Sequence, residues 1–170
     1  MIDLFGRRSV SIVGNFPFSE VGYDATTKTA RGKCQGPLTI VLGGKETLKT
    51  DSANYEVEAT ADLTRSRVSG NLKLTATFSS PSATLDATVH FAGPATFETK
   101  FPYAVAWQVP GQAEGQVKVG TRRREYFAAK GTADGRSEAV AMGVTDRMKV
   151  TVSRMEVTGK TRLRFPWLPL

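Results

Sequence analysis

The chain has 170 residues, of which 40% are hydrophobic and 23% charged, so its composition is that of one globular domain and argues against bulk disorder. It contains no run of 18 apolar residues, which excludes a transmembrane helix, and its N-terminal sequence MIDLFGRRSVSIVG lacks the apolar segment of a secretory signal. The single cysteine, Cys34, excludes an internal disulfide framework. These features are consistent with the cytoplasm or with a particle assembled there.

The formal net charge of +7 lies entirely in the last third of the chain. Residues 1–115 carry eleven basic and eleven acidic side chains, whereas residues 116–170 carry twelve basic and five acidic ones. This asymmetry indicates either an anionic partner on one side of the molecule or a solvated sheet face.

The N-terminal part of the chain gives a mixed signal. Residues 9–14 are typical of a short strand, but residues 19–36 are polar, rich in Thr, Lys and Gly, and without a clear period. We predict a long loop there, or an irregular hairpin punctuated by glycines. Residues 37–42 predict a strand that ends at Gly43-Gly44, and residues 45–52 fit either one helical turn or a connector.

The clearest pattern lies between Asp51 and Phe91, where apolar residues occupy every second position in three runs. A period of two places side chains on alternate faces of an extended chain, so each run predicts a half-buried strand. Turn residues at Ser69-Gly70 and at 79–82 separate the runs and indicate an antiparallel meander. The predicted buried face consists of Val57, Leu72, Leu74, Phe78, Leu85, Val89 and Phe91.

Beyond the meander, short alternating segments are separated by dipeptides that favour turns. We predict that strands end at Gly93-Pro94, Pro110-Gly111 and Asp134-Gly135. Residues 136–144 fit either a strand or a short helix, because their apolar residues do not distinguish the two periods. The alternation then slips by one position near Ser153-Arg154, which predicts a β-bulge.

About ten short strands with frequent turn signals predict an all-β fold, an antiparallel β-sandwich or barrel with little helix. We assign residues 1–164 to a single β domain, with an irregular loop at 19–36. Residues 165–170 form an extended C-terminal arm, because two prolines preclude a helix or a central strand. We expect its apolar side chains to dock in a groove of this domain or of a neighbour. These docking residues are Phe165, Trp167, Leu168 and Leu170.

The residues that usually carry catalysis are scarce. His90 is the only histidine, and although Asp86 precedes it by four residues on the same strand face, no nucleophile-elbow pattern supports a triad. We therefore predict a surface histidine. Glu56 and Glu58 share one strand face, whereas a glycosidase places its two carboxylates across a cleft. We predict that the protein is not an enzyme and has no cofactor or metal site.

Cys34 has basic neighbours, Arg31 and Lys33, that could lower the pKa of its thiol. Because the sequence indicates no base to partner it, we interpret Cys34 as an incidental thiol in the 19–36 loop.

A stronger candidate site is the segment TRRREYF at 121–127. Arginine forks bind phosphates and aromatic rings stack on bases, so the segment has the chemistry of nucleic-acid or polyanion binding. On a strand, however, the first and third arginines would share one face and the second would take the other, and arginines also serve subunit interfaces. The candidate anion- or partner-contacting residues are Arg122, Arg123, Arg124 and Tyr126.

Three functions fit these observations. The first is a structural or assembly subunit that self-associates or packs with other protein subunits, such as a component of a viral or phage particle or tail; this rests on fold-level analogy. The second is a barrel that holds a lipid or another amphiphile, lined in part by the aromatic segment 103–109. The third is a nucleic-acid or polyanion binder that uses the basic last third.

Overall fold

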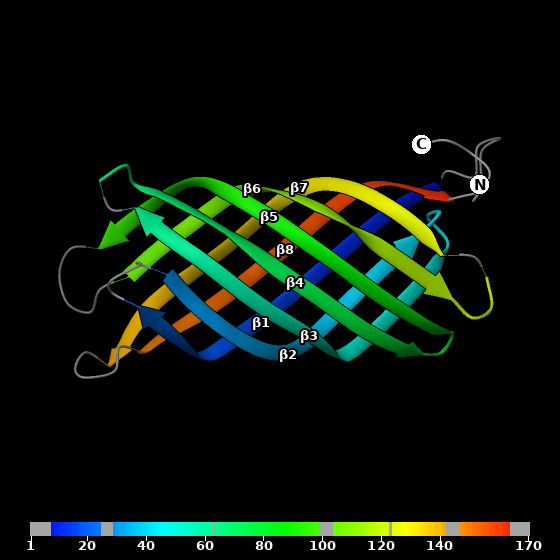
Figure 1. Cartoon of the computed structure of the whole chain (residues 1–170), viewed down its shortest axis with the longest axis horizontal. Coiled ribbons are helices and arrows are strands. Elements are labelled where there is room, and N and C mark those ends of the chain that lie inside the picture. The colour runs from blue at the N-terminus through cyan, green and yellow to red at the C-terminus, as the bar shows by residue number, and fades with distance from the viewer. Residues whose placement is uncertain are drawn as a thin grey trace.

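The computed structural model describes residues 8–24, 29–62, 64–98, 104–122, 124–141 and 147–163. Eight long antiparallel strands make up nearly all of these residues. Each strand pairs with the next one along the chain, and the last pairs with the first, so the sheet closes into a barrel (Figure 1). Among the described residues we find no apolar helix of membrane-crossing length. The strands are β1 (Arg8–Asp24), β2 (Thr29–Leu42), β3 (Glu46–Asp62), β4 (Arg67–Ser79), β5 (Ser82–Glu98), β6 (Ala104–Val119), β7 (Glu125–Ala141) and β8 (Arg147–Leu163).

The strands are staggered around the barrel. A ladder of paired residues that starts at Ala30 on β2 passes through β3 to β8 and β1, and returns to β2 at Ile40, ten residues further along. Closure with such a stagger requires strands tilted by roughly 35–45° to the barrel axis, and Figure 1 shows this slant. An eight-stranded barrel has an interior just wide enough for side chains to fill or for one small ligand.

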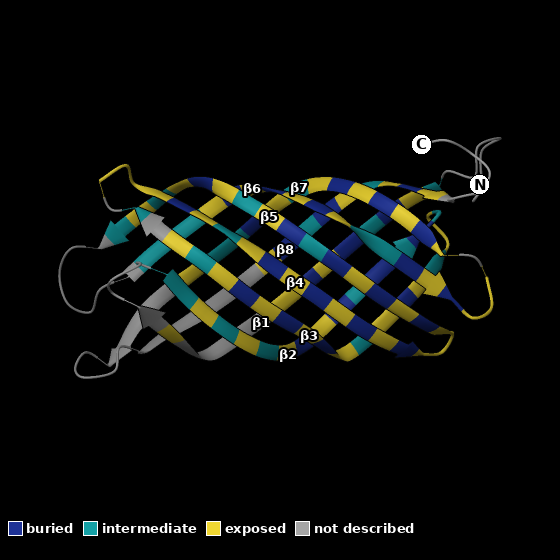
Figure 2. Ribbon diagram, viewed as in Figure 1, coloured by how far each residue is buried: buried dark blue, intermediate teal, exposed yellow. Residues whose placement is uncertain are grey.

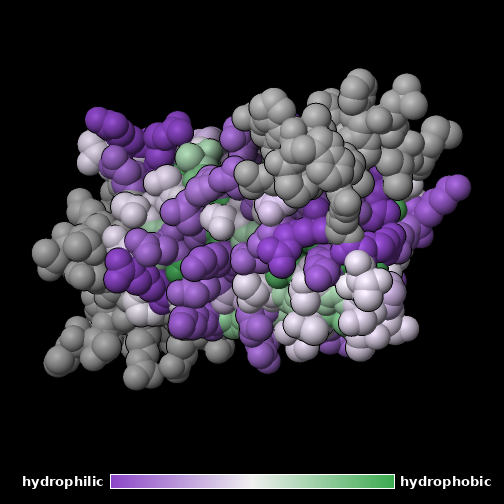
Figure 3. Space-filling model, turned by 45° about the vertical axis from the view of Figure 1, so that its right-hand side comes forward, coloured by the Kyte–Doolittle hydropathy of each residue, from purple (hydrophilic) through white to green (hydrophobic). Residues whose placement is uncertain are grey.

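Side-chain alternation separates an apolar interior from a polar exterior. Of the seven residues predicted to form the buried face of the meander, six are buried, and Phe91 also points inward but is half-buried. Figure 2 shows the alternation as buried and exposed bands along each strand. In Figure 3 the described outer surface is mostly hydrophilic. The predicted all-β antiparallel fold is therefore confirmed, as a closed barrel.

The strands are fewer and longer than predicted, because three of the predicted breaks are wrong. β5, β6 and β7 continue through Gly93-Pro94, Pro110-Gly111 and Asp134-Gly135. Prolines remove ladder hydrogen bonds, and the pairing of β5 with β6 is indeed interrupted there. β5 and β6 stay extended because each remains paired with the strand on its other side. Pro94 of β5 is opposite Arg67 of β4, and Pro110 of β6 is opposite Thr132 of β7. The first break of the meander lies earlier in the chain than predicted, because β4 begins at Arg67 and Ser69-Gly70 is inside it.

The predicted bulge near Ser153-Arg154 is confirmed. Asp134 of β7 pairs with Arg154 and Gly135 pairs with Val152, so Ser153 is the extra residue on β8. The register between β8 and β1 shifts at the same place. One extra residue of this kind reverses the phase of side-chain alternation along the strand.

Three further segments, for which the sequence left alternatives open, belong to strands. Residues 19–24 and 29–36 belong to β1 and β2, so the long-loop alternative is wrong, whereas an irregular hairpin describes them, with a register irregularity between Gly14 and Gly22. Residues 46–52 belong to β3 rather than to a helical turn, and residues 136–141 belong to β7 rather than to a helix. The β2–β3 turn uses Gly43 and Gly44 at φ of 62° and 72°, which suits the turn of a tight hairpin.

Gly131 on β7 lies where two strands approach closely. A Cβ there would lie 2.7 Å from Val157 Cα and would overlap the Glu156 carbonyl oxygen, both on β8. We expect Gly131→Ala to lower the free energy of unfolding by about 1 to 3 kcal/mol, because backbone atoms cannot move aside as a flexible side chain can. Urea unfolding measures this change, with Gly22→Ala as the control, because the nearest atom to its added Cβ is the Arg31 carbonyl oxygen at 3.9 Å. Equal effects of the two substitutions would contradict this reasoning.

Candidate functional site: the two ends of the barrel interior

A buried polar cluster lies toward one end of the barrel, and we call it the clasp: Arg8 of β1, Glu125 of β7 and Thr161 of β8. Arg8 and Glu125 form a two-pronged ion pair, in which Arg8 Nε donates to Glu125 Oε2 at 2.9 Å and Arg8 Nη2 donates to Oε1. The Thr161 hydroxyl donates to Glu125 Oε2 at 2.7 Å. The side chains of Arg8 and Glu125 are 9% and 10% exposed, so a charge pair occupies an interior position.

A second acid joins the clasp to the barrel rim. Glu46, at the start of β3, places Oε1 3.4 Å from Arg8 Nη1, an ion-pair distance without a hydrogen bond. Its Oε2 accepts a hydrogen bond from Arg122 Nη2 at 2.5 Å. Burial by itself lowers the pKa of Arg8, but the hydrogen bond and charge of Glu125, together with Glu46, outweigh it and raise the pKa above its ordinary value. The clasp is therefore charged and internally balanced.

Toward the opposite end of the interior, the described apolar side chains are only partly buried, and we call this part the aromatic end. Its inward-facing side chains pack against the buried core but remain half-buried. They come from the start of β2, the end of β3, the end of β5 and the start of β6, which Figure 1 places at the end away from the termini, and Figure 2 shows intermediate exposure there. The residues are Ala30, Cys34, Ala59, Phe91, Ala95 and Trp107.

Small residues make room for the two aromatic rings. Ala95 is opposite Trp107 in the β5–β6 register, and Phe91 is opposite Gly70 on one side and Gly111 on the other. A Cβ on Gly70 would lie 2.8 Å from Phe91 Cζ, so the ring packs against bare backbone at that position. Of the aromatic residues in the segment 103–109, Trp107 points inward, whereas Tyr103 lies outside the described residues.

Cys34 is not a loop thiol, as the sequence suggested, but an inward-facing residue of β2. Lys33 points to the opposite face of the strand, and burial, rather than neighbouring positive charge, dominates: desolvation raises the pKa of the Cys34 thiol to about 11. The sequence-based possibility of a lowered pKa is therefore wrong, because alternation turns the thiol away from its basic neighbours.

We expect Cys34 to react slowly with a thiol-specific disulfide reagent at pH 8. A pKa of about 11 instead of the ordinary 9.0 leaves roughly a hundredfold less thiolate, which is the reactive species. The rate is compared with that of the urea-unfolded chain, with glutathione in both solvents correcting for the effect of urea on the reagent. Because the chain has a single cysteine, every labelled molecule reports on this site. A folded-state rate equal to the unfolded-state rate would show that burial does not suppress ionisation.

The arginine segment does not form one described patch. Arg122 lies at the β6–β7 connection and pairs with Glu46, while Arg124 is exposed and donates through Nη1 to Gln116 Oε1 at 3.2 Å. Tyr126 points outward on β7 and is 37% exposed. Arg123 lies outside the described residues. Binding of an anion or a partner by these residues stays a prediction.

The C-terminal arm, with its docking residues Phe165, Trp167, Leu168 and Leu170, also lies outside the described residues. Docking of the arm, and the assembly function that depends on it, therefore stay predictions.

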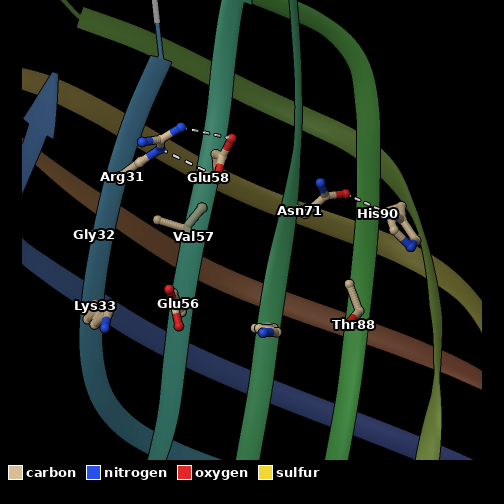
Figure 4. A pocket seen from close by; sticks show the side chains of 10 residues that line it. Arg31, Gly32, Lys33, Glu56, Val57, Glu58, Asn71, Thr88 and His90 are labelled. Atoms are coloured by element: carbon tan, nitrogen blue, oxygen red, sulfur yellow. Dashed lines mark hydrogen bonds and ion pairs between the residues drawn. The ribbon is translucent and has the colours of Figure 1, made fainter. Parts of the chain in front are cut away.

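The outer face carries the other polar candidates, and they lie around a shallow hollow of about 510 Å³ across β2 to β5 (Figure 4). His90 is exposed, as expected for a surface histidine. Its Nδ1 is 2.5 Å from Asn71 Oδ1 and its Nε2 is 3.6 Å from Glu114 Oε1, so these residues rather than Asp86 are its partners. Glu58 is exposed and pairs with Arg31 at 3.4 Å.

The clasp could have been suspected from the sequence, because Glu125 shares its inward phase with Phe127 and Ala129 on β7. Its partners could not, since Arg8 is 117 residues away. The described residues contain no cluster of three or more His, Cys, Asp or Glu side chains that would hold a metal ion. No protein family, curated protein or solved structure matches this chain.

Proposed function

We propose that this protein binds an apolar or amphipathic small molecule at the aromatic end of its barrel. The supporting observation is that the apolar interior continues beyond the buried core to six half-buried side chains, which include Phe91 and Trp107. Ligand sites in small barrels lie in the mouth of the barrel and are lined mostly by hydrophobic and aromatic residues. The clasp places paired charges toward the other end of the interior, so among the described residues the aromatic end suits an apolar ligand better.

The chain offers a matched pair of variants for a test. Ala95 faces inward beside Trp107, and its neighbour Thr96 is exposed on the outer face of β5. Binding of 1-anilinonaphthalene-8-sulfonate is followed by its fluorescence, and lauric acid is then added as a competitor. We expect Ala95→Trp to weaken binding of both by about tenfold or more, because its side chain fills the space beside Trp107. Thr96→Trp should leave binding within about twofold of the parent protein.

Far-ultraviolet circular dichroism and urea unfolding confirm that both variants are folded, since this dye also binds partly folded states. Equal affinity of the two variants, or no dye bound by the folded parent protein, would overturn the proposal.

A further inference from the structure

The outer surface contains three hollows that meet. They have volumes of about 510, 420 and 380 Å³ and lie over β2–β5, β5–β7 and β5–β8 respectively. The first two share Thr88, the first and third share His90, and the second and third share Glu114. They therefore adjoin at these three residues on the outer face of β5 and β6, and we call the three adjoining hollows the trough. It is separate from the interior site at the aromatic end.

The floor of the trough is strand backbone and its walls are outward side chains. Inward-facing residues such as Gly115 and Gly159 line it, which shows that it reaches down to the sheet itself. The outward side chains at Thr88, Ala128 and Thr158 are short, so they leave the space above the strand backbone open. Figure 4 shows its first part, where Arg31 and Glu58 pair on one side and Asn71 and His90 on the other.

The charges that line the trough are balanced. Four basic and four acidic side chains line the three hollows: Arg31, Lys33, Lys73 and Lys130, and Glu56, Glu58, Asp86 and Glu114. They alternate across the strands, since Glu56 lies between Lys33 and Lys73 in the ladder. A polyanion such as nucleic acid would meet four carboxylates here, and a polyanion site needs an excess of positive charge. The trough therefore favours a ligand without net charge.

The uncharged polar side chains that line the trough can both donate and accept hydrogen bonds. Amide, hydroxyl and imidazole groups, which can do both, alternate with the charged groups: Asn71, Thr88, His90, Gln112, Gln116 and Thr158. Tyr126 contributes an exposed aromatic side chain in the second hollow. A closed barrel has no free strand edge to which an extended peptide could add. Hydroxyl-rich ligands with an apolar ring face suit these side chains.

We propose that the trough binds a neutral oligosaccharide. Sugar hydroxyls would exchange hydrogen bonds with the paired walls, and the C–H face of one ring would lie on Tyr126. Thr88 lies where two of the hollows meet, so a large side chain there would divide the trough. Thr84 lies four residues away on the same outer face of β5 and lines none of the three hollows. This makes Thr84→Arg a control with the same change of charge and size as Thr88→Arg.

The test is a nuclear magnetic resonance titration of the ¹⁵N-labelled full chain with neutral hexasaccharides of β1,4-glucose, α1,4-glucose and β1,4-N-acetylglucosamine. We expect at least one to bind with a Kd below about 1 mM and to shift the amides of Thr88, His90 and Glu114. Thr88→Arg should weaken that binding by about tenfold or more, Tyr126→Ser by about threefold or more, and Thr84→Arg by less than twofold. The amide spectrum itself shows whether each variant is folded.

Several results would overturn this proposal. One is the absence of shifts at these amides with all three sugars at about 5 mM. A second is equal binding by the Thr88→Arg and Thr84→Arg variants. A third is that a single-stranded DNA hexamer or a neutral peptide shifts the trough amides at lower concentration than any of the sugars.

Discussion

Replacing Glu125 with methionine is expected to lower the free energy of unfolding by about 3 to 5 kcal/mol. The substitution leaves the Arg8 guanidinium buried without its two-pronged partner, and Glu46 approaches Arg8 from the rim without a hydrogen bond. Moving an unpaired charge out of water is costly, whereas a paired one is compensated by its partner and its hydrogen bonds. Urea unfolding followed by circular dichroism measures the loss, provided that the dependence on urea concentration keeps its slope.

Comparison of this variant with a double variant shows whether the loss of stability comes from the charge left behind. Arg8→Met combined with Glu125→Met removes both buried charges, and well-packed apolar replacements of buried ion pairs are often neutral or stabilising. We therefore expect the double variant to be more stable than the Glu125→Met variant. If Glu125→Met alone stays within about 0.5 kcal/mol of the parent protein, the clasp does not hold its charges in a water-excluded site.

Leu74→Ala is expected to cost about 2 to 5 kcal/mol. Leu74 is fully buried on β4, between Tyr55 of β3 and Ala87 of β5 in the ladder. The strands are held by hydrogen bonds on both sides and cannot move inward to fill a lost side chain. The cavity therefore remains, and its cost adds to the lost transfer free energy of the methyl groups.

The outward neighbour Thr75 supplies the control, because it is exposed on the other face of the same strand. Thr75→Ala should change the free energy of unfolding by no more than about 0.5 kcal/mol. The same result for Leu74→Ala would mean that the interior tolerates an unfilled space next to Tyr55.

The two proposed binding sites use opposite faces of the same strands. On β5, Phe91 and Ala95 face the aromatic end while Thr88 and His90 face the trough. Because successive side chains alternate, each face can carry its own chemistry without disturbing the other. Ala95→Trp and Thr88→Arg are therefore expected to act independently, each on its own ligand.

Alternation along the chain determined the class of fold and most of the central core. The apolar positions of β4, of β5, and of β3 from Ala53 onward follow a period of two, so the sequence of these segments alone assigns each side chain to a face. The bulge at Ser153 was readable for the same reason, because one extra residue must reverse that phase. The surface position of His90 followed from its polar phase on β5.

Closure of the sheet, and the sites that closure creates, were decided by tertiary structure. Turn dipeptides at Pro94 and Pro110 indicated strand ends, yet pairing on the second side of each strand keeps the backbone extended. Whether two sheets stack or one closes depends on the pairing of β1 with β8, residues that are separated by most of the chain. That pairing brings Arg8 next to Glu125. It also closes the barrel around Cys34, and burial there raises the pKa of the Cys34 thiol. Local periodicity contains no information about such distant partners, so the pairing of Glu125 with Arg8, the other residues of the aromatic end and the trough became visible only in the folded barrel.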